Sequence, residues 1–280
     1  IDADGVKNSS TYKFRGSSGK VIATADHLVM VSTYGAENTV EGSSLVGEEG
    51  LHVLRWNGNS EHGPTLKKFE FGMDHLTSNI SEKARKKIEK IEKKGEPILS
   101  EHLKVDELVL LSDNSLLITA QNRHKHTEVA SNGFTTETYY GQNVHLFNLS
   151  ERNLIRWSTQ IPVNQVNKTG NGIGYISKVI GRSVHVIFND HFDNLLKEWS
   201  TSQKVAKFTG KDDHAVAYVT INMDEPNAMQ DRVRLWKSRS AGVMLQPDLY
   251  FSHSDSDNGY VFLQGLDERK KLRLVRLQFE

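Results

Sequence analysis

A tryptophan recurs at the end of short aliphatic runs, and this repeat constrains the fold more than any other feature. The runs read LHVLRW, LIRW, LLKEW and VRLW and end at Trp56, Trp157, Trp199 and Trp236. The last three tryptophans are 42 and 37 residues apart, and the 101 residues from Trp56 to Trp157 fit two periods plus an insertion. Repeats of about 40 to 50 residues are typical of four-stranded β-propeller blades. We expect one tryptophan per blade to pack between neighbouring sheets.

The pattern of apolar residues predicts an all-β chain. Most of these residues lie in short runs rich in Val, Ile, Leu, Phe and Tyr, separated by turn-forming Gly, Asn, Asp and Ser clusters. A first unit of four antiparallel strands is expected at 105–112, 115–121, 143–149 and 154–160. A second is expected at 174–180, 183–188, 194–199 and 204–208, and a third from 215–222 onward. The strand count predicts a propeller of about six blades.

The length of the chain is compatible with one domain. All-β propellers of about this size form single domains, so we expect one domain over residues 1–280. The chain begins with Ile1 in a segment, IDADG, that resembles the end of a strand running into a turn. This predicts truncation at the N-terminus, and a lost export signal is one explanation.

One segment, 81–94 (SEKARKKIEKIEKK), predicts an inserted surface helix. It contains no turn residues, Ser81 is placed as an N-cap, and Gly95 is placed as a C-cap. Ala84, Ile88 and Ile91 form a narrow apolar stripe, and seven basic residues outnumber three glutamates on the remaining surface. We expect a solvated helix over the propeller rim, with docking to an acidic partner as the alternative.

Charge and composition exclude several classes of partner and site. The 35 basic residues balance 35 acidic ones, so no net field attracts nucleic acid or an anionic membrane. No apolar run of the sequence is long enough for a transmembrane helix. The absence of cysteine excludes disulfides and thiolate metal sites. A protein or glycan is left as the expected partner, with the oligomeric state open.

Two elements near the second unit resemble uncharacterised exported β-propeller proteins of Bacteroidetes-type bacteria. The first is a strand that ends in Trp and leads to an Ile-Pro-x-x-Gln element, and the second is a strand that ends in Asn-Asp with another Asn shortly after. The matching positions are Trp157, Ile161, Pro162, Gln165, Asn189, Asp190 and Asn194. The resemblance spans roughly residues 104–200, although Gln121 stands where those proteins have an acidic residue. It implies a propeller in an exported, periplasmic or cell-surface protein, and it implies no particular ligand or reaction.

Two motifs have the residue types of a metal site. His124 and His126 alternate in NRHKHTE, and alternate residues of an extended chain share a face that could hold one metal ion. Asp255 and Asp257 in HSDSDNG have the alternating carboxylates of a calcium loop, without the final glutamate of an EF-hand. An exposed loop and a tight hairpin turn are the alternatives. We expect no cofactor, with calcium as the alternative.

Three aromatic residues lie in the expected long loop at 122–142. Phe134, Tyr139 and Tyr140 have polar neighbours and could form a stacking platform for a sugar or peptide at one mouth of the propeller. Anchoring of the loop is the alternative role for these rings.

Three polar residues end a strand of the second unit. Asn189, Asp190 and Asn194 are typical of residues that cap a turn with their side-chain oxygens. Ligand contact at the propeller mouth is the alternative role.

No local catalytic motif is present, whether HExxH, GxSxG, a Walker loop or a dinucleotide-binding loop. We therefore expect a non-enzymatic binding or scaffold propeller of the bacterial cell envelope. The alternative is a carbohydrate-active hydrolase or lyase whose carboxylates come from several blades, because such pairs leave no local spacing. Asp190, Asp213 and Glu107 are the candidates. An assembly subunit is a third hypothesis.

Overall fold

The computed structural model of the chain describes residues 18–35, 48–58, 63–72, 82–94, 102–195, 205–210, 214–226, 232–235, 244–254, 259–266 and 272–279. These residues are mostly β-strand, arranged in four antiparallel sheets with few helical residues. The mostly-β prediction is therefore confirmed.

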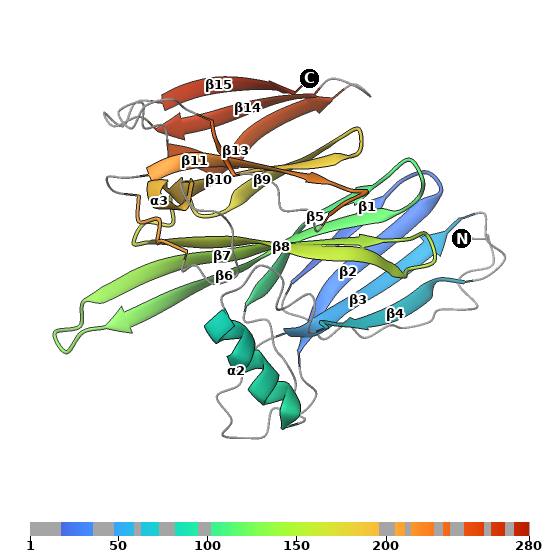
Figure 1. Cartoon of the computed structure of the whole chain (residues 1–280), viewed down its shortest axis with the longest axis horizontal. Helices are drawn as coiled ribbons and strands as arrows, with labels where there is room; N and C mark the ends of the chain where they lie inside the picture. The colour runs from blue at the N-terminus through green and yellow to red at the C-terminus, as the bar shows by residue number, and fades with distance from the viewer. Residues whose placement is uncertain are drawn as a thin grey trace.

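In each sheet the strands are neighbours in chain order (Figure 1). The first sheet consists of β1 (Gly19–Ala23), β2 (His27–Gly35), β3 (Glu48–Asn57) and β4 (Thr65–Glu70). The second consists of β5 (Leu103–Leu110), β6 (Leu116–Val129), β7 (Thr135–Leu149) and β8 (Ile155–Asn167), which confirms the order of strands expected for the first unit. The third consists of β9 (Tyr175–Ile180), β10 (Ser183–His191), β11 (His214–Asn222) and β12 (Val233–Arg234). The fourth consists of β13 (Met244–Ser254), β14 (Gly259–Leu266) and β15 (Leu272–Phe279).

The sheets stack face to face in chain order because each buries aliphatic side chains against the next (Figure 1). Val53 of β3 and Ile118 of β6 belong to the core between the first and second sheets. Leu117, the preceding residue of β6, packs with Phe188 of β10 in the core between the second and third sheets. A smaller cluster around Leu245 joins the third sheet to β13. The second sheet is thus buried on both faces.

The first strands of the sheets lie close to one another. β1 contacts β5, β9 contacts β13, and the Ser177 hydroxyl of β9 donates a hydrogen bond of 2.7 Å to Glu107 of β5. A propeller requires this arrangement of first strands. In the described part of the chain the first and fourth sheets lie at opposite ends of the stack and share no strand pairing (Figure 1). The closed ring and the six blades therefore stay a prediction.

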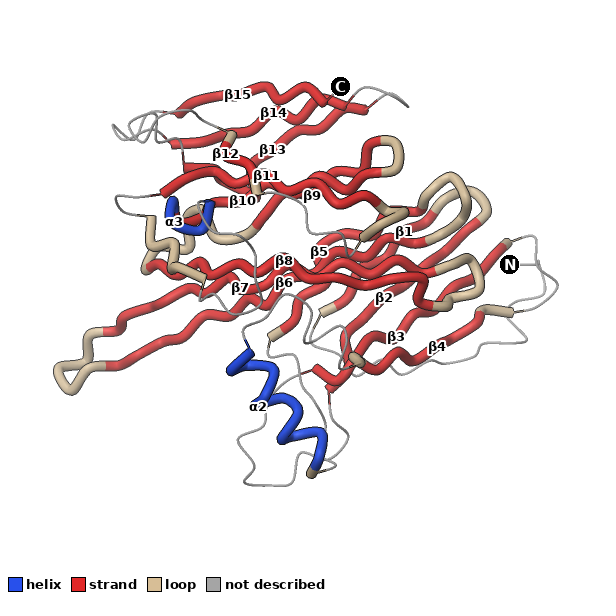
Figure 2. Tube along the Cα trace, viewed as in Figure 1, coloured by secondary structure: helices blue, strands red, loops and turns tan. Residues whose placement is uncertain are grey.

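The prediction of a long loop at 122–142 is wrong. β6 and β7 continue through it as a projecting hairpin, paired from His124 and Tyr140 out to Val129 and Thr135 (Figure 2). Its turn is closed by a 2.8 Å hydrogen bond from the Ala130 N–H to the Phe134 carbonyl. The outer half of the hairpin is exposed on both faces, so its strands lack the apolar alternation by which a half-buried strand is predicted.

The prediction of outer strands at 194–199 and 204–208 is also wrong for the described part of these segments, residues 194–195 and 205–208. β11 and β12 complete the third sheet, and α3 (Phe192–Leu195) follows β10. Phe208 lies along the edge of β8, where it exchanges backbone hydrogen bonds of 2.8 Å with Asn164 and Val166. The prediction failed because a short apolar run does not indicate which sheet it joins.

The expected helix is confirmed as α2 (Glu82–Lys93), between the first and second sheets in sequence. Ile88 is half-buried and packs against the first core, whereas Glu82 and Lys86 form an exposed ion pair of 2.6 Å. No described helix is long and apolar enough to cross a membrane.

The tryptophans do not all pack between sheets. Trp56 is 40% exposed, so the prediction is wrong for this residue. The reason is strand alternation, because Val53 faces the second sheet and Trp56, three positions later, points to the opposite face. Trp157 is half-buried and packs against the second core. Trp199 and Trp236 lie outside the described residues.

Phe188→Ala is expected to lower the free energy of unfolding by about 3–5 kcal/mol, because the fully buried ring would leave a cavity in the second core. Trp56→Ala is the control and should cost much less, since that ring is already 40% exposed. Urea denaturation of both variants measures the difference. Equal costs would contradict the placement of Trp56 on an open face.

Candidate functional site

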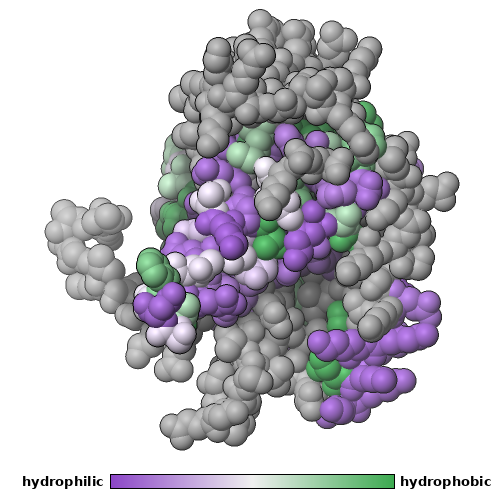
Figure 3. Space-filling view, turned by 90° about the vertical axis from the view of Figure 1, so that its left-hand side faces the viewer, coloured by the Kyte–Doolittle hydropathy of each residue, from purple (hydrophilic) through white to green (hydrophobic). Residues whose placement is uncertain are grey.

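A pocket of about 530 Å³ opens where the β6–β7 hairpin leaves the second sheet, and we call it the hairpin pocket. Its lining combines basic and aromatic side chains with a loop: Lys104, Arg123, His124, Lys125, Tyr139, Tyr140, Thr169, Gly170, Asn171 and Ile173. The lining contains no Asp or Glu. Figure 3 faces the side from which the hairpin projects, where hydrophilic residues dominate the described surface.

Strand geometry places two cations and one ring on the same wall of the pocket. Arg123 and Lys125 are two residues apart on β6 and share a face, and Lys125 is paired with Tyr139 of β7. The β8–β9 loop completes the lining. A Cβ added at Gly170 would lie 3.3 Å from the Tyr139 ring, and the φ of Gly170 is +75°. Any larger residue at position 170 would therefore be strained and would crowd the ring.

The alternate positions of the hairpin carry a stack of three rings. His124 is paired with Tyr140, with ring centroids 4.4 Å apart, and His102 lies against His124 at 4.5 Å. Because successive strand residues alternate, this stack lies on the face of the hairpin opposite to Arg123 and Lys125. The stack stabilises the base of the hairpin and places His124 and Tyr140 at the edge of the pocket.

Two of the three pocket cations have carboxylate partners outside the lining. Arg123 forms an ion pair with Asp106 of β5, and Lys125 forms one of 2.7 Å with Glu137 of β7. Lys104 is exposed, and none of the ion pairs found among the described residues involves it. The pocket therefore has a net positive charge.

A β-bulge directs a half-buried carboxyl group toward Arg123. Asp106 is the residue at which the register between β5 and β6 shifts, and bulges of this kind re-aim side chains. Burial raises the pKa of Asp106 to about 6, although Arg123 and the Tyr175 hydroxyl lower it. The neighbouring Glu107 accepts the hydrogen bond from Ser177. Asp106 thus lies behind the pocket cation Arg123, and Glu107 lies next to β9.

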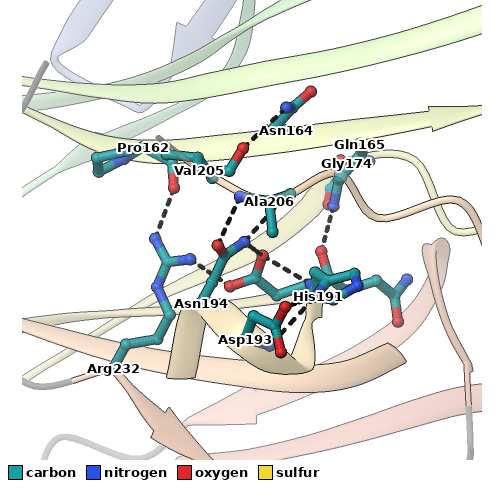
Figure 4. Close-up of polar contacts among 12 residues, drawn as sticks. Pro162, Asn164, Gln165, Gly174, His191, Asp193, Asn194, Val205, Ala206 and Arg232 are labelled. Carbon is teal, nitrogen blue, oxygen red and sulfur yellow. Dashed lines mark hydrogen bonds and ion pairs between the residues drawn. The ribbon is translucent and has the colours of Figure 1, made fainter. Parts of the chain in front are cut away.

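A second polar cluster is buried between the second and third sheets (Figure 4). Asp190 accepts hydrogen bonds from Arg232, from Asn194 Nδ2 at 2.7 Å and from the His191 N–H at 2.9 Å. Arg232 also donates to the Pro162 carbonyl at 2.5 Å. The Asp190 and Arg232 side chains are each 1% exposed. Burial lowers the pKa of Arg232, and the Asp190 carboxylate opposes that change.

Two amide side chains extend this cluster, and each forms hydrogen bonds with the backbone N–H and C=O of one residue, as a paired strand residue does. Asn189 donates to the Gly172 and Leu245 carbonyls and accepts from the Leu245 N–H, all at 2.8 Å. Gln165 donates to the Gly174 carbonyl at 2.9 Å and accepts from the Gly174 N–H at 2.8 Å. These contacts attach the third sheet to β13 and to β8. Gln165 and Asn189 are therefore inter-sheet contacts.

Asn189, Asp190 and Asn194 were also predicted as ligand contacts. All three are buried, and their side-chain groups bond to other parts of the chain. Asn194 pairs with the Ala206 backbone in both directions, at 2.7 and 2.9 Å. These residues serve as structural contacts here, and ligand contact by them stays a prediction.

The other predicted site residues are only partly brought together. Tyr139, Tyr140 and His124 line the hairpin pocket, whereas Phe134 is 74% exposed at the hairpin tip. His126 lies 3.5 Å from Glu128 on the exposed part of the hairpin.

The metal predictions stay predictions. Within the described residues no group of three or more His, Asp or Glu side chains is placed to hold a metal ion. Asp255 and Asp257, the calcium candidates, lie outside the described residues, as does the candidate carboxylate Asp213.

Sequence reasoning missed most of the charged residues of these sites. Arg123 and Lys125 alternate in the same NRHKH string as the histidines, so the alternation argument that paired the imidazoles also pairs the cations. Nothing local indicates the bulge at Asp106. The Asp190–Arg232 pair spans 42 residues and leaves no local pattern.

Comparisons with known proteins give no strong relative. No protein family matches the sequence, and no curated protein matches it. A thermostable family-43 glycoside hydrolase of known structure is 9% identical, over 95% of this chain and 92% of that one, with a TM-score of 0.28. A Trypanosoma rangeli sialidase in complex with the inhibitor DANA is 10% identical, over 94% of this chain and 44% of that one, also at 0.28. An α-L-arabinofuranosidase from Clostridium thermocellum is 8% identical, over 93% of each chain, at 0.22. These scores are too low to support an argument.

Arg232→Met is expected to lower the free energy of unfolding by about 3–5 kcal/mol, because it leaves the buried Asp190 carboxylate without a counter-charge. Adding Asp190→Asn to this variant should recover part of the loss. The control is Arg182→Met, which breaks the exposed pair with Asp224 and should leave stability nearly unchanged. Urea denaturation compares the variants, and similar stabilities for Arg232→Met and Arg182→Met would refute the structural role of the buried pair.

Proposed function

We propose that the chain is a non-enzymatic, saccharide-binding β-propeller of the bacterial cell envelope, and that the saccharide binds in the hairpin pocket. The observation that carries the proposal is the lining of this pocket, which combines Tyr139 and three cations with Thr169 and Asn171 of the β8–β9 loop. The ring and the polar groups converge on one space, as they do in small-ligand sites.

A sugar ring suits this lining for physical reasons. Its C–H face packs favourably on an aromatic ring, and its hydroxyl groups need both donors and acceptors. Tyr139 supplies the ring, and Thr169 and Asn171 supply the polar groups. The volume of about 530 Å³ lies within the range of roughly 300–1,000 Å³ that is typical of ligand pockets.

Separate observations support the propeller fold and the exported location in this proposal. The sheets stack with their first strands close together, as neighbouring blades do. The sequence elements around Gln165 and Asn189 resemble those of exported propeller proteins. An exposed polar pocket is also consistent with a protein that meets glycans outside the cell.

Tyr139→Ala is expected to weaken saccharide binding roughly tenfold, because it removes the stacking surface. The measurement is isothermal titration calorimetry with a panel of envelope and cell-wall oligosaccharides. Phe134→Ala is the matched control, since that ring lies at the hairpin tip outside the pocket lining and should leave affinity unchanged. An equal effect of the two substitutions, or no binding by any member of the panel, would refute the proposal.

A carbohydrate-active hydrolase is the second candidate, and the carboxyl pair at the bulge favours it. Asp106 contacts Arg123, which lines the pocket, and Glu107 is its neighbour on β5. Burial raises the pKa of Asp106 to about 6, so a substantial fraction is protonated in mildly acidic solution. Glycoside hydrolysis uses one protonated carboxyl as general acid together with a second carboxyl group, and Asp106 is the candidate for the acid.

If this candidate is right, hydrolysis is expected to slow as pH rises through about 6, because the general acid Asp106 then loses its proton. Asp106→Asn should abolish activity at every pH. Asp113→Asn is the control, because Asp113 forms its ion pair with Arg156 on the exposed surface, whereas Asp106 forms one with Arg123 of the pocket lining. The assay measures the release of reducing ends from oligosaccharides below and above this pH. Full activity of Asp106→Asn would exclude the role of Asp106 as general acid.

A further inference from the structure

We propose that the ligand of the hairpin pocket is an acidic saccharide, whose carboxylate or sulfate group is bound by Lys104 and Arg123 while its ring packs on Tyr139. The inference rests on the proposed binding function and adds the chemical class of the ligand. Its basis is the placement and the charge balance of the three pocket cations.

The three cations form a row on one face of the second sheet. Lys104 is paired with Gln121 across the β5–β6 ladder, and Gln121, Arg123 and Lys125 occupy alternate positions of β6. Lys104, Arg123 and Lys125 therefore share the face on which Tyr139 lies. A ligand whose ring contacts Tyr139 has its substituents directed along this row.

The charge balance of the row is incomplete. Asp106 offsets the charge of Arg123, and Glu137 offsets that of Lys125. Lys104 forms none of the ion pairs found among the described residues and shares only the longer-range attraction of Asp106, and the lining itself holds no carboxylate. A neutral ligand would displace water from these cations without returning a charged acceptor, which is unfavourable. A carboxylate or sulfate returns charge-assisted hydrogen bonds, and the Arg123 fork suits either oxyanion.

The positive charge is local to the pocket. The chain as a whole has 35 basic and 35 acidic residues, so long-range attraction of any polyanion is weak. Recognition must then come from short contacts within the pocket. This favours an acidic group that is part of a ligand small enough to enter the pocket.

The test compares three tetrasaccharides of matched length by isothermal titration calorimetry: a tetragalacturonate, a sulfated galactan fragment and a neutral galactotetraose. The unmodified chain is expected to bind at least one acidic probe roughly tenfold or more tightly than the neutral one. Affinity for that probe should fall as salt concentration rises. Comparison of the tetragalacturonate with the sulfated galactan fragment shows whether the pocket prefers a carboxylate or a sulfate group.

Lys104→Met is the informative variant, because removing this side chain breaks no ion pair of the described residues and leaves the Arg123–Asp106 pair intact. It should bring affinity for the acidic probe close to the affinity that the unmodified chain has for the neutral one. Lys67→Met is the matched control, an equal change of charge on the exposed β4 of the first sheet. Equal binding of acidic and neutral probes, weakened by Tyr139→Ala, would overturn the acidic ligand and leave the binding function standing. No binding of any probe would overturn both.

Discussion

Burial of aliphatic side chains between successive sheets is the interaction on which this structure depends. Leu117 and Ile118 are adjacent on β6 and are both fully buried, one in the core toward the third sheet and one in the core toward the first. A strand buried on both faces has a continuous apolar sequence, and LLIT at 116–119 is close to that pattern. The stack cannot lose one sheet without exposing faces of its neighbours, and this explains why the packing is continuous from β1 to β13.

Polar side chains complete the contacts that aliphatic packing leaves unmade. Where β8, β9, β10 and β13 approach one another, backbone N–H and C=O groups would be buried without strand partners. Asn189 and Gln165 supply donors and acceptors in the geometry of a peptide group. Asp190 and Arg232 hold the adjoining segments as a buried ion pair. Such a network is stabilising only when every member is bonded, so its residues tolerate few substitutions. The Asn, Asp and Gln residues of these sequence elements therefore meet a structural demand of the fold, whether or not a ligand binds.

The sequence predicted the parts of the fold that depend on local patterns. Aliphatic runs predicted the order of strands in the second sheet, and the spacing of Ile88 and Ile91 predicted the helix. The β6–β7 hairpin was missed because residues 125–129 are exposed on both faces and show no apolar alternation. The bulge at Asp106 was missed because it depends on register with β6. Leu245 bonds to Asn189 across 56 residues, and no local pattern reports a pairing at that separation. Of the candidate site, His124, Tyr139 and Tyr140 were predicted, whereas the cations beside them were not.

β6 explains why the candidate site lies where it does. Its first part, to Asn122, is buried, and its pairing with β5 ends at that residue. The opposing register with β7 shifts at the same point, between Gln121 and Asn122. From Arg123 onward the strand is released from the stack, so its side chains can carry charge without the cost of full burial. The core and the pocket are thus consecutive parts of one strand. Substitutions at Lys125 or Tyr139 act on exposed or half-buried side chains, so a loss of binding there reports on the ligand site, whereas substitutions at Leu117 or Ile118 act first on the fold.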